Sequence, residues 1–189
     1  MAKRMGFVIN VKRCVGCKTC TVSCKMENTV AAGLARIRVL DDHQAEVFDK
    51  PTGTYPNPVR NFVPVPCQHC DNAPCVPVCP TGASKKREDG IVYVVKEDCI
   101  GCGVCVAACP YGSRQMDKES KKVDKCTLCM HRLEEGKDPM CVYCCPGRAI
   151  TYGDLNDANS EAAKLVSSQT AKTIKSELGT GPAAYYILP

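Results

Sequence analysis

The chain has 189 residues, and 25 Lys and Arg outnumber 20 Asp and Glu, which gives a formal net charge of +5 at pH 7. Its 44% hydrophobic content includes 17 cysteines, whereas there are only three Phe, seven Tyr and no Trp. An ordinary apolar core would therefore be thin, and cysteine is the residue type in excess. No run approaches the ~18–20 apolar residues of a membrane-spanning helix, which predicts a soluble chain.

The first predicted elements are short strands. Residues 6–11 are a strand candidate, and residues 61–65 look extended but are bounded by prolines. Residues 41–60 between them are a loop-rich connector. Residues 84–95 predict a β-hairpin, because Glu88–Asp89–Gly90 is a turn signal between two extended segments.

The second half predicts one more hairpin and two helices. Residues 114–116 and 122–123 are expected to pair across a turn over residues 117–121. Residues 128–135 and 161–168 carry helical patterns, and Ser160 is a suitable N-cap for the second of them.

One unit, C-x2-C-xn-C-x3-C, occurs four times, with n equal to 2, 4, 2 and 11. Its four runs are Cys14, Cys17, Cys20 and Cys24; Cys67, Cys70, Cys75 and Cys79; Cys99, Cys102, Cys105 and Cys109; and Cys126, Cys129, Cys141 and Cys145. Proline follows the last cysteine of the last three runs, and Lys25 takes that place in the first. Sixteen of the 17 cysteines belong to this repeat, and Cys144 is the remaining one.

Three uses of so many cysteines compete: disulfides, structural zinc and iron–sulfur clusters. A disulfide scaffold needs export, but residues 1–11 lack the apolar segment of a signal peptide, and an odd count leaves one thiol over. Zinc predicts separate C-x2-C pairs and not three closely spaced cysteines followed by a fourth. Iron–sulfur ligation accounts for the whole pattern.

The spacing within each run suits a [4Fe–4S] cube. Short gaps let the loop curl around one cube, and glycines at 16, 101 and 103 allow the positive φ that such loops require. Four residues of helix advance about 6 Å, so the fourth thiol is carried toward a second cube, as in two-cluster ferredoxins. The proline after it then ends the helix.

An even number of runs predicts that the runs form pairs. The second and third runs flank the hairpin over residues 84–95 and are expected to form one ferredoxin-like module, so the first and fourth runs form the other. We therefore predict an α+β fold of two ferredoxin-like, βαββαβ-type, loop-rich modules built around four [4Fe–4S] clusters. The boundaries are 1–60 plus 117–155 for the outer module, 61–116 for the inserted module, and 156–189 for a C-terminal helix and tail.

The basic charge does not indicate a nucleic-acid-binding protein. Each cube with four thiolates carries roughly −2, so four would add about −8 and leave the loaded chain near −3. Lys and Arg are also scattered along the chain, apart from short runs such as Lys85–Lys86–Arg87. We therefore interpret the basic excess as compensation for buried cluster charge.

The chain resembles the four-cluster iron–sulfur subunits of molybdopterin oxidoreductases of the dimethyl sulfoxide reductase type, such as those of polysulfide, thiosulfate and arsenate reductases. The resemblance rests on CVGCKTCTVSCKMEN (14–28), PCQHCDNAPCVPVCPTGA (66–83), DCIGCGVCVAACPYG (98–112) and KCTLCMHRLEEGKDPMCVYCCP (125–146). It implies that each run supplies three ligands to one cluster and one ligand to its partner's. The implied sets are Cys14, Cys17, Cys20 and Cys145; Cys126, Cys129, Cys141 and Cys24; Cys67, Cys70, Cys75 and Cys109; and Cys99, Cys102, Cys105 and Cys79.

The resemblance also implies the partners. The first-run cluster would face a large molybdopterin catalytic subunit, and the third-run cluster a quinone-linked integral membrane subunit. Two rivals remain: a free polyferredoxin, and the corresponding subunit of a soluble molybdopterin enzyme. We expect no catalytic residue in this chain and no signal peptide. Its location is either cytoplasmic or membrane-associated, including export in the folded state together with a partner.

A few residues near the cysteines have more than one interpretation. Cys144 adjoins Cys145 and is expected to be a spare thiol, because only Cys145 keeps the spacing of four from Cys141. The histidines at 69 and 131 are expected to make loop or partner contacts and not to bind iron. Solvated side chains are the default expectation for Lys25, Lys125 and Arg132, although any of them could offset cluster charge.

Overall fold

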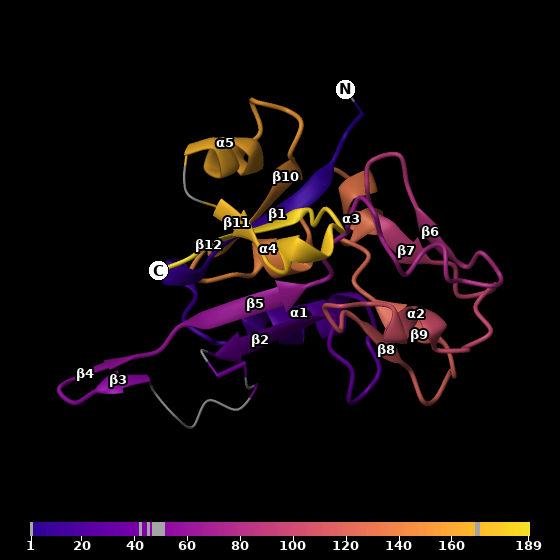
Figure 1. The fold of residues 1–189 in the computed structure, drawn as a ribbon, viewed down its shortest axis with the longest axis horizontal. Helices are drawn as coiled ribbons and strands as arrows, with labels where there is room; N and C mark the ends of the chain where they lie inside the picture. The colour runs from indigo at the N-terminus through magenta and orange to yellow at the C-terminus, as the bar shows by residue number, and fades with distance from the viewer. Residues whose placement is uncertain (1, 42, 45, 47–51, 169–170) are drawn as a thin grey trace.

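The computed structural model describes residues 2–41, 43, 44, 46, 52–168 and 171–189. Its largest described sheet has four strands in the order β10–β1–β12–β11 (Figure 1). β1 pairs antiparallel with β10 and parallel with β12, so both ends of the chain share this sheet. The strand bounds are Met5–Asn10 for β1, Ile150–Asp154 for β10, Ala171–Thr173 for β11 and Ala184–Ile187 for β12.

Side chains of β1 point alternately to the two faces of this sheet, and the two faces have different neighbours. Val8 packs with Ala162 of α5 (Glu161–Ser168), which covers one face of the sheet. Phe7 and Ile9 point the other way and join Tyr186 in the main core, where several cysteines are also buried. The sheet therefore separates α5 from the part of the molecule that contains the cysteine runs.

A second layer lies below this sheet in Figure 1. There β2 (Ile37–Asp41) pairs antiparallel with β5 (Phe62–Pro66), and α1 (Thr19–Glu27) packs against β2 and against α4 (Met140–Tyr143). β3 (Thr52–Thr54) and β4 (Asn57–Val59) form a hairpin that projects away from the rest.

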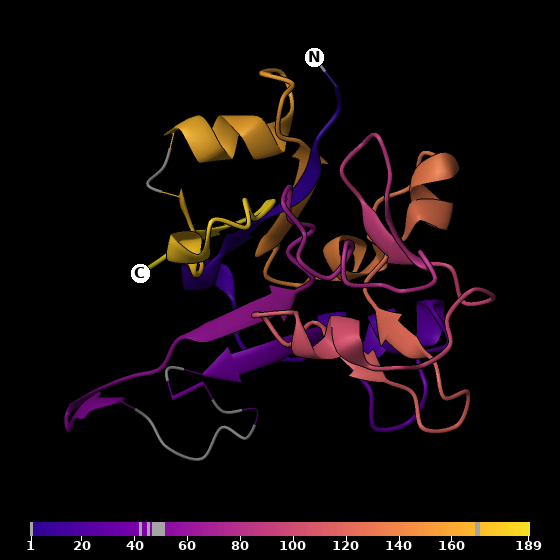
Figure 2. The same cartoon turned by 45° about the vertical axis from the view of Figure 1, so that its right-hand side comes forward.

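Two hairpins occupy the opposite side of the molecule (Figures 1 and 2). They are β6 (Ser84–Lys86) with β7 (Val92–Val94), and β8 (Arg114–Met116) with β9 (Val123–Lys125). The remaining short elements are α2 (Val104–Ala107), which lies against β8, α3 (Met130–Glu134), and the 3-10 turns η1 (Val11–Arg13) and η2 (Ser176–Leu178).

The local predictions agree with much of this arrangement. The hairpin over residues 84–95 is confirmed, as is the one across residues 117–121, although β9 begins one residue later than expected. The helix over residues 161–168 is confirmed, and its predicted cap is present because the Ser160 hydroxyl accepts a hydrogen bond from the Ala163 N–H at 3.1 Å.

Two predictions were partly wrong. The helix expected over residues 128–135 starts only at Met130, because Leu128 and Cys129 have φ values of 55° and 49°. The connector over residues 41–60 contains the β3–β4 hairpin, which was not predicted, while residues 42, 45 and 47–51 of it lie outside the described part of the chain.

Candidate metal centres

All 17 cysteines lie in the described part of the chain, and each has a free thiol. The structure brings the sixteen repeat cysteines into four groups, each containing three cysteines of one run and one of another. We number these cysteine groups 1 to 4 in the order in which they adjoin one another. Among the described residues, no three His, Cys, Asp or Glu side chains converge tightly enough for a single metal ion.

Cysteine group 1 joins the start of the chain to the region after α4. Its members line one cavity, together with Val39, Pro64 and Ile150; they are Cys14, Cys17, Cys20 and Cys145. The first three follow η1 and enter α1, and the fourth follows α4.

Cysteine group 2 lies between α1 and the fourth run. Its members are Cys24, Cys126, Cys129 and Cys141, and all four are buried. The Asn28 side-chain amide lies 3.6 Å from both the Cys24 and Cys129 sulfurs, which fixes their proximity. Burial raises the pKa of the Cys141 thiol well above its ordinary value, and the neighbouring thiols of this group raise it further.

Cysteine groups 3 and 4 occupy the side of the molecule with the two hairpins. Group 3 lines a second cavity and consists of Cys67, Cys70, Cys75 and Cys109. Group 4 lines a third cavity and consists of Cys79, Cys99, Cys102 and Cys105. In both groups the fourth cysteine of each run faces the cavity of the other run.

The four groups coincide with the four sets that the resemblance implies, and their assignment as iron ligands stays a prediction. Four soft thiols around one enclosed space are the donor set of a [4Fe–4S] cluster. Burial raises the pKa of the Cys20 thiol to about 12 and that of the Cys126 thiol to about 11, so these two stay protonated as free thiols. A bound metal reverses this preference, because a coordinating thiol is deprotonated. The residues present therefore fit the cluster.

The same backbone turn recurs in all four C-x2-C segments. The residue before the second cysteine has a positive φ in each: 69° at Gly16, 40° at His69, 70° at Gly101 and 55° at Leu128. The two non-glycine residues are buried, so packing holds them in a conformation that costs energy. This turn aims backbone N–H groups inward, and the Leu128 N–H lies 3.3 Å from the Cys126 sulfur.

Steric contacts explain why glycine occupies two of these positions. A Cβ at Gly101 would lie 2.0 Å from the Lys121 carbonyl oxygen, and one at Gly16 would lie 2.8 Å from the Phe62 ring. Such distances are far below van der Waals contact, so both positions exclude a side chain. The expectation of positive φ at these glycines is confirmed.

Two short helices carry the exchanged cysteines of groups 1 and 2. Cys20 and Cys24 are one turn apart on α1, while Cys141 and Cys145 are four residues apart at α4. An advance of about 6 Å per four residues separates the two thiols along each helix. Because α1 packs against α4, each helix contributes to both groups.

Cys144 points toward α1. Its sulfur lies 2.6 Å from the Ser23 hydroxyl oxygen, and that hydroxyl donates its hydrogen to the Thr19 carbonyl at 2.8 Å. The thiol is therefore left as the donor to Ser23. Cys145, and not Cys144, is among the described residues that line the group 1 cavity, so the ligand assignment of Cys145 keeps its geometric basis and remains a prediction.

Buried cations lie beside groups 2, 3 and 4. Lys125 is only 2% exposed and donates to the carbonyls of Val92 and Cys126, so the default expectation of a solvated lysine is wrong here. Arg114 is also 2% exposed and lines the cavities of groups 3 and 4. Two buried positive charges among thiols suit a site that holds negative clusters.

The histidines differ in their environments. His69 is 2% exposed, and its Nδ1 accepts the Val92 N–H at 3.0 Å, so it is an interior residue and the expected loop or partner contact is wrong. Burial lowers its pKa well below the ordinary value, and the charges of Lys125 and Arg114 act in the same direction. His131 lies outside, 2.9 Å from a Glu27 carboxylate oxygen.

The other two cations near the cysteines serve local structure. Lys25 donates to the carbonyls of Ala31 and Leu34 at 2.8 and 2.7 Å and so closes the loop after α1. Arg132 lies 3.2 Å from Glu27 and donates to the Asp138 carbonyl at 2.7 Å.

Sequence reasoning missed three residues beside the groups. Arg114 stands in a predicted hairpin strand, where nothing in the sequence marks it as central. Arg36 and Asn28 form a network with group 2, because Arg36 donates to the Asn28 side-chain oxygen at 3.0 Å. The Asn28 position four residues after Cys24 was the one available signal, since it places the amide one turn along the helix from that thiol.

Comparison with protein families gives two matches to the 4Fe-4S dicluster domain, over residues 59–155 and 13–83. A Halobacterium salinarum protein assigned as a dimethyl sulfoxide reductase iron–sulfur subunit is 40% identical, with 96% of this chain and 78% of that protein covered. A tetrathionate reductase subunit of Salmonella typhimurium is 42% identical, with coverages of 97% and 72%. A selenate reductase subunit of Mesobacillus selenatarsenatis is 38% identical, with coverages of 96% and 70%.

The chain belongs to the iron–sulfur subunits of dimethyl sulfoxide reductase-type molybdopterin oxidoreductases. Its two dicluster domains and 17 cysteines correspond to four [4Fe–4S] clusters, and its function is electron transfer. The ferredoxin-like, mixed α and β character is confirmed. No helix among the described residues has the length and apolarity to cross a bilayer.

Proposed function

We propose that this iron–sulfur subunit relays single electrons between a molybdopterin catalytic subunit and a quinone-linked membrane subunit. When bound, each cluster takes up and releases one electron. Cysteine groups 1 to 4 are the sixteen ligands in this proposal. The chain itself fixes the spacing of the groups and sets their surroundings, because the redox chemistry belongs to the cofactor.

The contacts between groups support one order of transfer. Cys20 of group 1 lies close enough to Cys141 of group 2 to interact with it electrostatically. Cys67 of group 3 interacts in the same way with Cys126 of group 2. Groups 1 and 3 therefore both adjoin group 2. Arg114 borders the cavities of groups 3 and 4. The path therefore runs through groups 1, 2, 3 and 4 in that order.

The observation that carries the proposal is the exposure of the two ends of this path. The two exposed repeat cysteines are Cys17 in group 1 and Cys102 in group 4, whereas all of group 2 is buried. An apolar side chain stands near each exposed cysteine, Val15 at 66% exposure and Ile100 at 67%. Two exposed apolar ends and a buried middle are expected of a relay between two partners.

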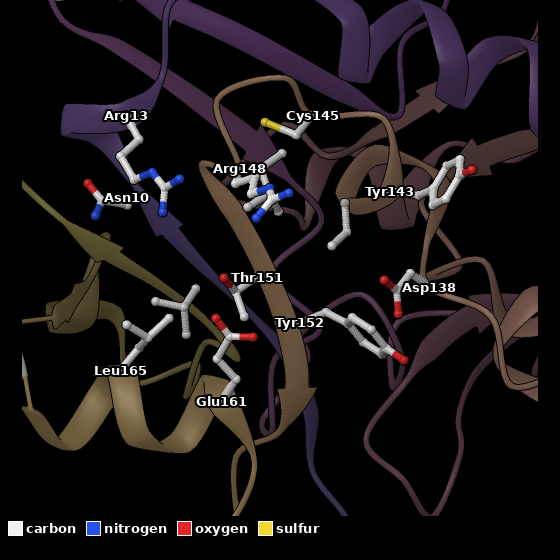
Figure 3. Close-up of a pocket in the computed structure, with 13 residues that line it drawn as sticks. Asn10, Arg13, Asp138, Tyr143, Cys145, Arg148, Thr151, Tyr152, Glu161 and Leu165 are labelled. Carbon is white, nitrogen blue, oxygen red and sulfur yellow. The ribbon is translucent and has the colours of Figure 1, made fainter.

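A pocket beside Cys145 adds a recognisable surface at the group 1 end. Figure 3 shows Arg13 and Arg148 near Cys145, with Tyr143 at the far side of the same hollow. Tyr143 is 73% exposed, and Arg and Tyr are enriched at protein interfaces. We assign this end to the catalytic subunit and the Ile100 end to the membrane subunit.

The proposal includes the domain organisation. Residues 1–60 with 117–155 would form the outer module around groups 1 and 2, and residues 61–116 the inserted module around groups 3 and 4. Residues 156–189 would complete the outer module, since β11 and β12 extend the sheet of β1. In this arrangement the chain reaches the membrane through its partner subunit.

The proposal is tested by two matched substitutions in the native complex. Val15→Glu is expected to weaken association with the catalytic subunit, and Ile100→Glu association with the membrane subunit, because each buries a charge in an apolar contact. Leu188→Glu, at a residue 48% exposed and outside the cysteine runs, is the control. Affinity purification with mass spectrometry reads the partners. Loss of the same partner in both variants, or of neither, would contradict the proposed ends.

A further inference from the structure

The guanidinium group of Arg114 lies between two of the cluster cavities. Arg114 opens β8, directly after the third cysteine run, and β8 packs against α2, which carries Cys105. Its side chain borders both the group 3 cavity and the group 4 cavity, and the residue is 2% exposed. One buried cation therefore faces two cavities.

The hydrogen bonds of Arg114 are incomplete among the described residues. One terminal nitrogen, Nη2, donates to the Ser84 hydroxyl at 2.6 Å. The other donors, on Nε and Nη1, are buried and make no hydrogen bond of regular geometry there, although the Cys105 thiol of group 4 interacts with this side chain. A buried charged donor without an acceptor is strongly unfavourable, so these N–H groups require acceptors that belong to the site.

A guanidinium group keeps its charge in a protein. The thiols of Cys67 and Cys75, and that of Cys105, line the two cavities that Arg114 borders. These thiols belong to groups 3 and 4, which agrees with the position of the side chain between the cavities.

Lys125, the other buried cation nearby, differs in this respect. Its Nζ donates to two backbone carbonyls, those of Val92 and Cys126, so it already has acceptors within the protein. His69 accepts the Val92 N–H through Nδ1 and has no hydrogen-bond partner on Nε2 among the described residues. Arg114 is therefore the charged group whose free donors are left for the clusters.

We propose that Arg114 is a shared electrostatic residue of the clusters in groups 3 and 4, donating through Nε and Nη1 to their sulfurs and raising both reduction potentials. The inference rests on the ligand sets of the proposed function. Reduction adds one negative charge to a cluster, and a nearby cation favours that form. Hydrogen bonds to the sulfurs act in the same direction.

The test is a redox titration of the anaerobically purified, cluster-loaded protein, followed by electron paramagnetic resonance. Arg114→Met removes the charge and the donors, and Arg114→Gln removes the charge while keeping a polar group. We expect the ratio of reduced to oxidised cluster at a fixed potential to fall on the order of tenfold, which is 59 mV for a one-electron couple. Two of the four midpoint potentials shift, and the other two stay.

Two control variants separate charge from structure. Arg114→Lys keeps the charge and is expected to lower the same two potentials by less than the neutral variants do. Ser84→Ala removes the hydrogen bond to Nη2 but leaves the cation, so its potentials should stay close to those of the unsubstituted protein. The Arg114→Lys variant also shows whether the site tolerates a different cation.

Each remaining outcome overturns the inference. A shift of one potential alone, an equal shift of all four, or no shift at full iron content would show that Arg114 is not shared. Loss of clusters in both neutral variants would assign the guanidinium to assembly instead. A failure of the ligand sets is recognised separately, because Cys79→Ser would then perturb the cluster of its own run and not that of group 4.

Discussion

Replacing Arg36 by methionine tests whether a buried ion pair holds the two halves of the cluster-binding region together. The Arg36 guanidinium contacts both Asp124 carboxylate oxygens at 2.8 Å, and the two side chains are only 12% and 10% exposed. The pair links the segment before β2 to strand β9, next to group 2. Lys96 adds a second cation 3.1 Å from the same carboxylate.

The size of the effect follows from what remains after the substitution. Removing one partner of a buried pair costs about 3–5 kcal/mol, because the other charge is left uncompensated. Lys96 still offsets part of the Asp124 charge, although its own side chain is 40% exposed. We therefore expect the lower end, about 3 kcal/mol. If the ion pair is already broken in the transition state for unfolding, most of this loss appears in the unfolding rate, which then rises on the order of 100-fold.

The assay is the rate at which anaerobic, cluster-loaded protein loses its visible absorbance in guanidinium chloride, since unfolding that releases clusters is irreversible. The double variant Arg36→Met with Asp124→Leu leaves no unpaired carboxylate and should recover most of the lost kinetic stability. Arg36→Met unfolding as slowly as the unsubstituted protein would refute the reasoning. The reasoning would also be refuted if the loss of kinetic stability in the double variant equalled the sum of the losses in Arg36→Met and Asp124→Leu.

Three further predictions concern the cysteine groups. Cys24→Ser should perturb the cluster of group 2 in site-resolved spectroscopy and spare that of group 1; the opposite result would reject the exchange of ligands. Cys144→Ala should keep full iron content whereas Cys145→Ala loses a cluster, and the reverse order of iron loss would reassign the ligand. Gly101→Ala should cost the group 4 cluster because its Cβ meets a backbone oxygen at 2.0 Å. The control is Gly82→Ala, at a glycine with φ +66° and no atom near the added Cβ, which should keep all iron and lose about 1–2 kcal/mol of folding stability. If both variants kept or lost iron equally, the steric contact at Gly101 would not be the cause.

The sequence is most informative where the interactions are local. Turn signals predicted both hairpins, Ser160 predicted a helix start, and the cysteine spacing predicted that the fourth cysteine of each run lies toward a second group. A short run of residues determines each of these features. The order of the runs predicted their pairing, and the resemblance to a known family then implied the four ligand sets.

Long-range packing could not be predicted in the same way. β1 pairs in parallel with β12, which lies at the other end of the chain, and no local pattern encodes that contact. The burial of Lys125, His69 and Arg114 is equally a consequence of tertiary packing, since each would be solvated in an isolated segment. Which basic side chains lie beside the cluster sites can therefore be determined only from the folded structure.

The central claim is that sixteen cysteines of this chain hold four [4Fe–4S] clusters. The most direct measurement is the content of iron and acid-labile sulfide per chain in anaerobically purified protein. The account predicts about sixteen of each, four per cluster. A reproducible value near twelve would mean that one cysteine group is not a cluster site, and stoichiometric zinc in place of iron would contradict the account as a whole.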